Sequence, residues 1–199
     1  MNRNIKQGNR GFTVVEALVA IMILSVSVAG MLGVTASSAT SARYANNEIT
    51  ANYLLQEAVD SVRNSRDTIA FQMKDTTGGW VTFLDRYGYP SDKCFSDTRG
   101  CILKMEDFDA TGLASGNNDV ILCSVSGCGY LSYDNSDTPV SLFYNYSGYG
   151  SPTSFVRTVK MVVTQSNPDE LKVTATVDWL NGTSPRSRSL EIYLLDWKK

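Results

Sequence analysis

Histidine is absent from this chain of 199 residues. Because imidazole is the commonest general base and a frequent zinc ligand, its absence excludes a Ser-His-Asp triad and most catalytic zinc sites. Charge is also scarce over one long stretch, since Glu16 is the only ionisable residue between Phe12 and Ala36. The chain therefore lacks the common imidazole general base and contains an apolar run that needs its own explanation.

The apolar run from Phe12 to Ala36 is long enough to cross a bilayer. As a helix rising ~1.5 Å per residue it would extend roughly 37 Å, whereas a hydrocarbon core is ~30 Å thick. A secretory signal peptide is the alternative, and Ser37-Ser38-Ala39 resembles a signal-peptidase site. A signal h-region, however, usually spans only ~7–15 residues. We therefore expect a transmembrane helix over residues 12–36.

Acidic residues are missing from the segment before this run, which carries Arg3, Lys6 and Arg10. Because basic residues favour the cytoplasmic side of a membrane helix, we expect the N-terminus in the cytoplasm and everything after Ala36 outside. The net charge of −2 includes this basic leader, so the remainder of the chain is more acidic. That balance argues against a nucleic-acid binder that works by a basic patch.

Cysteine is also rare, and all four cysteines lie in the part expected to be exported: Cys94, Cys101, Cys123 and Cys128. An oxidising compartment favours disulfides, and four cysteines allow three connectivities. The pairs 94–101 and 123–128 are preferred because each joins residues already close along the chain. A four-cysteine zinc site is the rival interpretation, but neither spacing resembles C-x-x-C.

Helix-breaking residues do not follow the apolar run directly, so the helix is expected to continue. Its apolar face changes part-way, which suggests two different partners for one rod. We predict one helix from about Phe12 to about Arg66, with its first half in the membrane and its last turns on a globular domain. The two faces are formed by Ala42, Ala45, Ile49 and Tyr53, and by Leu55, Ala58, Val59 and Val62.

Strand patterns dominate the C-terminal part. Residues 171–179 alternate between apolar and polar side chains, which is the period of a half-buried strand. Valine-rich Phe155–Gln165 precedes it and Ser189–Trp197 follows it, and shorter strands are expected at Val120–Val125 and Val140–Tyr146. Short connections imply antiparallel neighbours.

A sheet with one apolar face must be covered, and the stripe from Leu55 to Val62 is the available cover. The predicted fold class is therefore α+β. One long N-terminal helix, apolar in its first half, packs its distal half on an antiparallel sheet.

Three residues at the head of the apolar run stand in a specific arrangement: Gly11, Phe12 and Glu16. With the basic leader and the uninterrupted helix, the sequence resembles the type IV pilin superfamily, which comprises type IV pilins, minor pilins and the pseudopilins of type II secretion. The resemblance is detailed over about Met1 to Leu32 and architectural beyond it. It implies that a prepilin peptidase of the inner membrane cuts after Gly11 and methylates the new amine of Phe12.

The resemblance also gives Glu16 a role. A carboxylate inside a membrane helix is costly unless it is paired, although the dipole of a helix N-terminus favours it. In a filament, Glu16 would face the amine of residue Phe12 on an adjacent subunit and so set the assembly register. The implied partners are other pilins or pseudopilins through the N-terminal helix, prepilin peptidase and an inner-membrane assembly platform.

The family likeness implies a division of the chain into four segments. These are a cleaved cytoplasmic leader at 1–11, a transmembrane and filament-core helix at 12–36, an amphipathic continuation at 37–66 and a globular α+β head at 67–199. The protein would first be a single-pass inner-membrane protein and then part of a filament in the periplasm or at the cell surface.

Gly33 stands where many major pilins carry a helix-kinking proline, which favours a minor pilin or a pseudopilin. The expected function is a minor pilin-like subunit that enters a pilus or primes its assembly, and no enzyme activity is expected. A minor pseudopilin of a type II secretion system is the alternative. A tip adhesin is the third hypothesis, for which Tyr144, Tyr146 and Tyr149 form a candidate contact patch, although alternating aromatics also commonly pack on a core.

An incomplete calcium-loop pattern lies in the turn-rich region. Asp107, Asp109 and Gly112 fit an EF-hand-like loop, but the last ligand position holds Asn118 rather than glutamate. Asp107 and Asp109, with Asp119, are therefore candidate calcium ligands, and a solvated acidic loop is the alternative. No other cofactor is expected.

Overall fold

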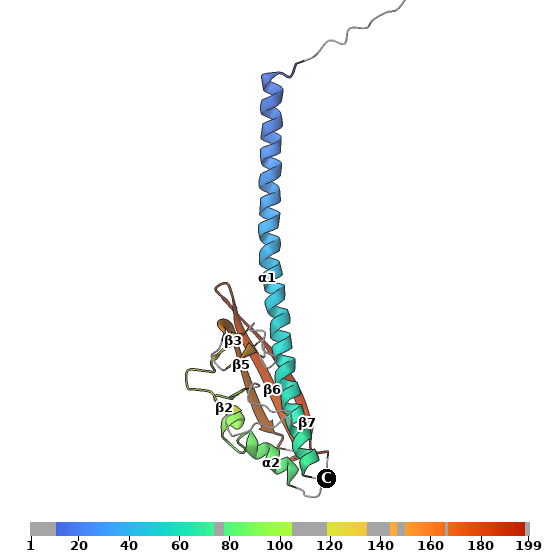
Figure 1. Ribbon diagram of the computed structural model, residues 1–199, viewed down its shortest axis with the longest axis vertical. Helices are drawn as coiled ribbons and strands as arrows, with labels where there is room; N and C mark the ends of the chain where they lie inside the picture. The colour runs from blue at the N-terminus through green and yellow to red at the C-terminus, as the bar shows by residue number, and fades with distance from the viewer. Residues whose placement is uncertain are drawn as a thin grey trace, which may run out of the picture. The chain divides into compact units, whose positions relative to one another are not determined.

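The computed structural model describes residues 11–73, 78–104, 119–134, 144–146, 150–165 and 167–197 (Figure 1). The chain divides into two compact units, Met1–Asn46 and Asn47–Lys199, called here the N-terminal and the C-terminal unit. One long apolar N-terminal helix and an antiparallel sheet are both present, which confirms the predicted α+β class.

Helix α1 spans Val14–Gln72. It ends beyond the expected Arg66 because Ser65 and Ile69 extend the buried stripe that begins at Ala51. The residues predicted to cover the sheet are buried, whereas Ile49 and Tyr53 on the other face are exposed. Figure 1 shows the part of α1 in the C-terminal unit running alongside β5, β6 and β7.

Over the described residues the sheet has seven strands, and every pairing between them is antiparallel. A short helix α2 (Gly79–Arg86) and a 3₁₀ turn η1 (Lys93–Phe95) precede it. The strands are β1 (Cys101–Leu103), β2 (Val120–Leu122), β3 (Tyr130–Tyr133), β4 (Tyr144–Asn145), β5 (Ser151–Val163), β6 (Glu170–Asn181) and β7 (Ser184–Leu195).

Strands β5, β6 and β7 correspond to the three strands expected after Pro152. Strand β7 begins at Ser184 rather than Ser189, because the polar residues before Leu190 pair with β6 as far as Asn181↔Ser184. Strand β2 stops at Leu122, before the expected Val125. Of the predicted strand at Val140–Tyr146, residues 140–143 lie outside the described part of the chain.

The core lies between α1 and one face of the sheet. Alternate residues of β6 are buried, from Leu171 to Trp179, together with Phe155, Val159 and Met161 of β5. One charged side chain is buried among them: Arg157 is 1% exposed, and its Nη1 lies 2.6 Å from Oε2 of Glu57 on α1. Its two Nη atoms also donate to the carbonyl oxygens of Leu54 and Leu103. This guanidinium therefore joins β5 to α1 and β1.

Candidate functional site

The head of α1 is the first candidate site. Gly11, Phe12 and Thr13 are exposed and precede the helix, which begins at Val14. The Glu16 backbone N–H donates to Thr13 Oγ1 at 3.3 Å, so the threonine hydroxyl caps the first turn. A peptidase that acts between Gly11 and Phe12 would meet an accessible, non-helical backbone.

Thr13 is a functional candidate that the sequence prediction missed. Thr13-Val14-Val15-Glu16 fits the T-x-x-E pattern of a capping box, in which threonine at the N-cap stands three residues before a glutamate. The same pattern places Glu16 in the first helical turn, where the partial positive charge of the helix end favours a carboxylate. Glu16 thus has a local structural reason for its position besides any role in assembly.

The side chains that follow Glu16 in the N-terminal unit are exposed, among them Leu18, Ile21, Leu24 and Leu32. Helix α1 is long and apolar enough to cross a membrane by length and composition. Gly30 and Gly33 lie within it, and a Cβ at either would meet nothing within 4 Å. The exposed apolar surface of this unit suits a hydrocarbon environment, which fits a single-pass membrane-anchored protein.

The cysteines form two disulfides, Cys94–Cys101 and Cys123–Cys128. These are the pairs preferred from the sequence. Cys94 in η1 and Cys101 in β1 are fully buried, whereas the loop between Cys123 and Cys128 is exposed. Within the described ranges, no group of three cysteine, histidine or carboxylate residues is arranged to hold a metal.

Two of the three tyrosines of the expected contact patch pack inward. The Tyr144 ring makes edge contacts with Tyr133 and Phe155, at centroid distances of 5.3 and 6.0 Å. Tyr146 donates its hydroxyl to the carbonyl of Arg157 at 2.9 Å. Tyr149 lies outside the described residues. The two described rings thus support the core more than they offer a free surface.

Of the candidate calcium ligands, only Asp119 lies in the described part of the chain. Asp119 is 2% exposed, and its carboxylate forms an ion pair with the Arg86 guanidinium of α2. The pair fixes the start of β2 against α2. Asp107 and Asp109 lie outside the described residues, so calcium binding stays a prediction.

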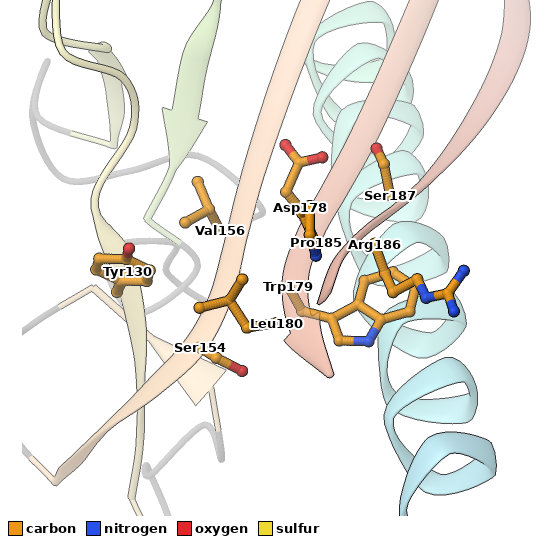
Figure 2. A pocket seen from close by; sticks show the side chains of 9 residues that line it. All are labelled: Tyr130, Ser154, Val156, Asp178, Trp179, Leu180, Pro185, Arg186 and Ser187. Carbon is orange, nitrogen blue, oxygen red and sulfur yellow. The ribbon is translucent and has the colours of Figure 1, made fainter. Parts of the chain in front are cut away.

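A groove on the sheet is the second candidate site. It has a volume of about 370 Å³ and is lined by residues of β3, β5, β6 and β7: Tyr130, Ser154, Val156, Asp178, Trp179, Leu180, Pro185, Arg186 and Ser187. Figure 2 shows Asp178 and Ser187 pointing to one side of the β6–β7 hairpin, with Trp179 and Arg186 on the other. The sequence prediction missed this groove.

The comparisons with known proteins bear on the first site. Residues 6–32 match the prokaryotic N-terminal methylation motif, the type IV prepilin-like signature. No match was found among curated proteins or among solved structures. The matched segment holds Gly11, Phe12 and Glu16 and ends inside the apolar part of α1. The chain therefore carries the type IV prepilin-like N-terminal signature over residues 6–32, which points to a structural subunit.

Proposed function

We propose that this chain is a minor type IV pilin-like subunit that prepilin peptidase cuts after Gly11 and that then enters a pilus or primes its assembly. The observation that carries the proposal is the methylation motif at residues 6–32, placed on an exposed, non-helical segment directly before a helix fit for a membrane. The leader would direct the chain to the peptidase, the helix would anchor it in the membrane, and the head would form the exposed domain.

The proposed role of Glu16 follows from removal of the leader. Cleavage after Gly11 would create an amine on Phe12, and an adjacent subunit would bring this amine to the carboxylate in an oily environment. A charge pair at ~4 Å is attractive by about 4 kcal/mol at an effective dielectric of ~20, before desolvation is subtracted. Because desolvation offsets much of this attraction, the pair would set register more than it adds stability.

The most direct experiment is mass spectrometry of the mature N-terminus from cells that contain the peptidase. We expect the protein to begin at Phe12, with a mass increase that corresponds to one methyl group on its amine. A Gly11→Val variant should keep its leader, because glycine is the residue that lets an extended backbone enter a protease without a side-chain clash. A mature protein that begins elsewhere would rule the proposal out.

A second experiment tests Glu16 separately from cleavage. A Glu16→Gln variant keeps the side chain's shape but loses its charge, so it should be cleaved normally and be lost from sheared filaments. Glu16→Asp is the matched control, since it keeps the charge and should retain part of the incorporation. Equal incorporation of Glu16→Gln and the wild type would show that the carboxylate has no role in assembly.

A minor pseudopilin of a type II secretion system is the second candidate. Gly33 favours it as much as a minor pilin, because α1 passes through this position without a break. Deletion of the gene separates the two functions: loss of surface pili with normal enzyme export supports the pilin, and the reverse supports the pseudopilin. The adhesin hypothesis keeps little support, since Tyr144 and Tyr146 are engaged with the core.

A further inference from the structure

The sheet contains a fork where β5 leaves β6. Strands β6 and β7 pair along their whole length, as far as Asn181↔Ser184. The pairing of β5 with β6, in contrast, reaches only Val156↔Asp178. The other edge of β5 pairs with β3, from Val156 back to Ser151, with a register shift between the pairs Tyr130↔Val156 and Ser132↔Pro152. The β6–β7 hairpin therefore extends past the point at which its other neighbour turns away.

The register shows which backbone groups face the fork. The Thr164 N–H donates to the carbonyl of Glu170, so this pair is hydrogen bonded. In an antiparallel ladder every second pair is of this kind, and the series therefore runs through Val156–Asp178. The next member would be Ser154–Leu180, which is not formed. The pairing of β6 with β7 is regular through Asn181↔Ser184, so within the described residues the N–H and C=O groups of Leu180 point away from β7 and into the fork without a strand partner. Ser154 lies opposite on β5, in the stretch where the pairing with β3 shifts its register.

The groove of Figure 2 coincides with this fork, because Ser154 and Leu180 both line it. Its walls carry apolar surface that solvent reaches: Tyr130 is 62% exposed and Leu180 is 48% exposed. Val156 and Pro185 complete these walls. The groove therefore contains both unpaired backbone groups of a strand and exposed apolar side chains.

Asp178 gives the fork a charge. It is an exposed residue at the last β5–β6 pair, and its carboxylate has no ion pair or hydrogen bond with another described residue. On the same face of the sheet, Lys172 and Glu191 neutralise each other at 2.8 Å. Arg186 also lines the groove but lies on the other side of the β6–β7 hairpin from Asp178. On the side of Asp178 the fork thus combines a carboxylate with apolar side chains, which suits a ligand that carries a cation.

We propose that the fork binds an extended segment of a partner protein that adds a short strand between β5 and β6. The segment would hydrogen bond to the backbones of Ser154 and Leu180, place apolar side chains against Tyr130 and Leu180, and bring a lysine or arginine to Asp178. Backbone groups at strand spacing fit a peptide better than a sugar, because a peptide repeats its donors and acceptors at that interval. This interaction is independent of filament assembly and goes beyond the proposed function.

Fluorescence anisotropy with the full-length protein in a neutral detergent tests the proposal. The probes are labelled heptapeptides with valine, leucine, isoleucine or phenylalanine at alternate positions and lysine or arginine between them. We expect saturable binding of at least one of these peptides. A copy N-methylated at alternate residues keeps every side chain but loses backbone donors, so its binding should weaken about tenfold or more.

Two charge variants complete the test. Asp178→Lys should weaken binding about tenfold or more. Asp85→Lys, which makes the same change on α2 away from the fork, should leave binding unchanged, and thermal unfolding should show that both variants are folded. The proposal fails if no peptide in the set binds or if N-methylation has no effect. It also fails if an oligosaccharide, and not a peptide, binds in a manner that Asp178→Lys abolishes.

Discussion

The two units of the chain use apolar residues in opposite ways. In the N-terminal unit the apolar side chains of α1 are exposed, whereas in the C-terminal unit the same helix buries one stripe in a core with the sheet. Under the proposed function, the apolar side chains of the N-terminal unit would find their partners in lipid or in other chains, whereas the C-terminal unit buries most of its apolar side chains within itself. Substitutions in the first should therefore alter insertion and assembly, and substitutions in the second should alter folding.

The largest expected loss of stability comes from Arg157. Its guanidinium is buried and bound to Glu57, Leu54 and Leu103. Arg157→Ala leaves these acceptors without their donor and opens a cavity. We expect it to lower the free energy of unfolding by about 3–5 kcal/mol, measured by chemical denaturation of the full-length protein in detergent. Arg63→Ala is the control: its exposed pair with Asp60 should contribute less than about 1 kcal/mol.

A pair of leucine variants on one helix tests the contrast between the units directly. Leu54 is 3% exposed and Leu24 is 64% exposed. Leu54→Ala should lower the free energy of unfolding of the C-terminal unit by about 2–5 kcal/mol, because it creates a cavity in the core. Leu24→Ala should leave that transition unchanged. Equal effects of the two substitutions in the same denaturation experiment would contradict the contrast between the buried apolar stripe of the C-terminal unit and the exposed apolar side chains of the N-terminal unit.

The helix was predictable because its signals are local. The apolar run, the absence of helix breakers and the change of apolar face all act within a few turns. The alternation in residues 171–179 likewise identified β6. The capping box at Thr13 is also local, but it places the helix start at Val14, whereas the prediction began the helix at about Phe12.

The remaining features depend on contacts distant in sequence. Nothing near Arg157 indicates that it will meet Glu57, since the two residues are a hundred positions apart. Nothing local to Asp119 indicates Arg86 as its partner. The fork at Ser154 and Leu180 arises because the β5–β6 pairing stops at Val156↔Asp178, while the other edge of β5 continues to pair with β3. Strands as short as β1 and β3 carry too few residues for a clear period. The point at which a strand pairing ends is a property of the assembled sheet.

Alkaline pH gives a smaller, graded effect through Tyr87. Complete burial raises the pKa of Tyr87 to about 12 from its ordinary 10.0. Ser65 opposes this rise, although the geometry of the two hydroxyls does not form a hydrogen bond. Below pH 10 the tyrosine is protonated in both the folded and the unfolded chain, so this contribution to stability is fully present.

Above pH 10 the unfolded chain loses the Tyr87 proton while the folded chain keeps it. Stability should then fall by about 1.4 kcal/mol per pH unit until the folded pKa is reached. A Tyr87→Phe variant should show a shallower decline in urea unfolding at several alkaline pH values and little change at neutral pH. Burial also raises the pKa of Tyr144, so some decline should remain in the variant. An unchanged slope would show that Tyr87 does not stay protonated in the folded protein.

The smallest effect is expected on the outer face of the sheet. Lys172 Nζ lies 2.8 Å from Oε1 of Glu191, and the two side chains are 36% and 49% exposed. The hydrogen bond between them raises the pKa of Lys172 and lowers that of Glu191, so both groups stay charged at neutral pH. Because water solvates both charges in the folded and the unfolded chain, Lys172→Gln should leave the unfolding midpoint within experimental error. A clear loss of stability would mean that the solvent face of the sheet contributes to folding as the face toward α1 does, and the contrast between buried and exposed surfaces would then fail inside the C-terminal unit itself.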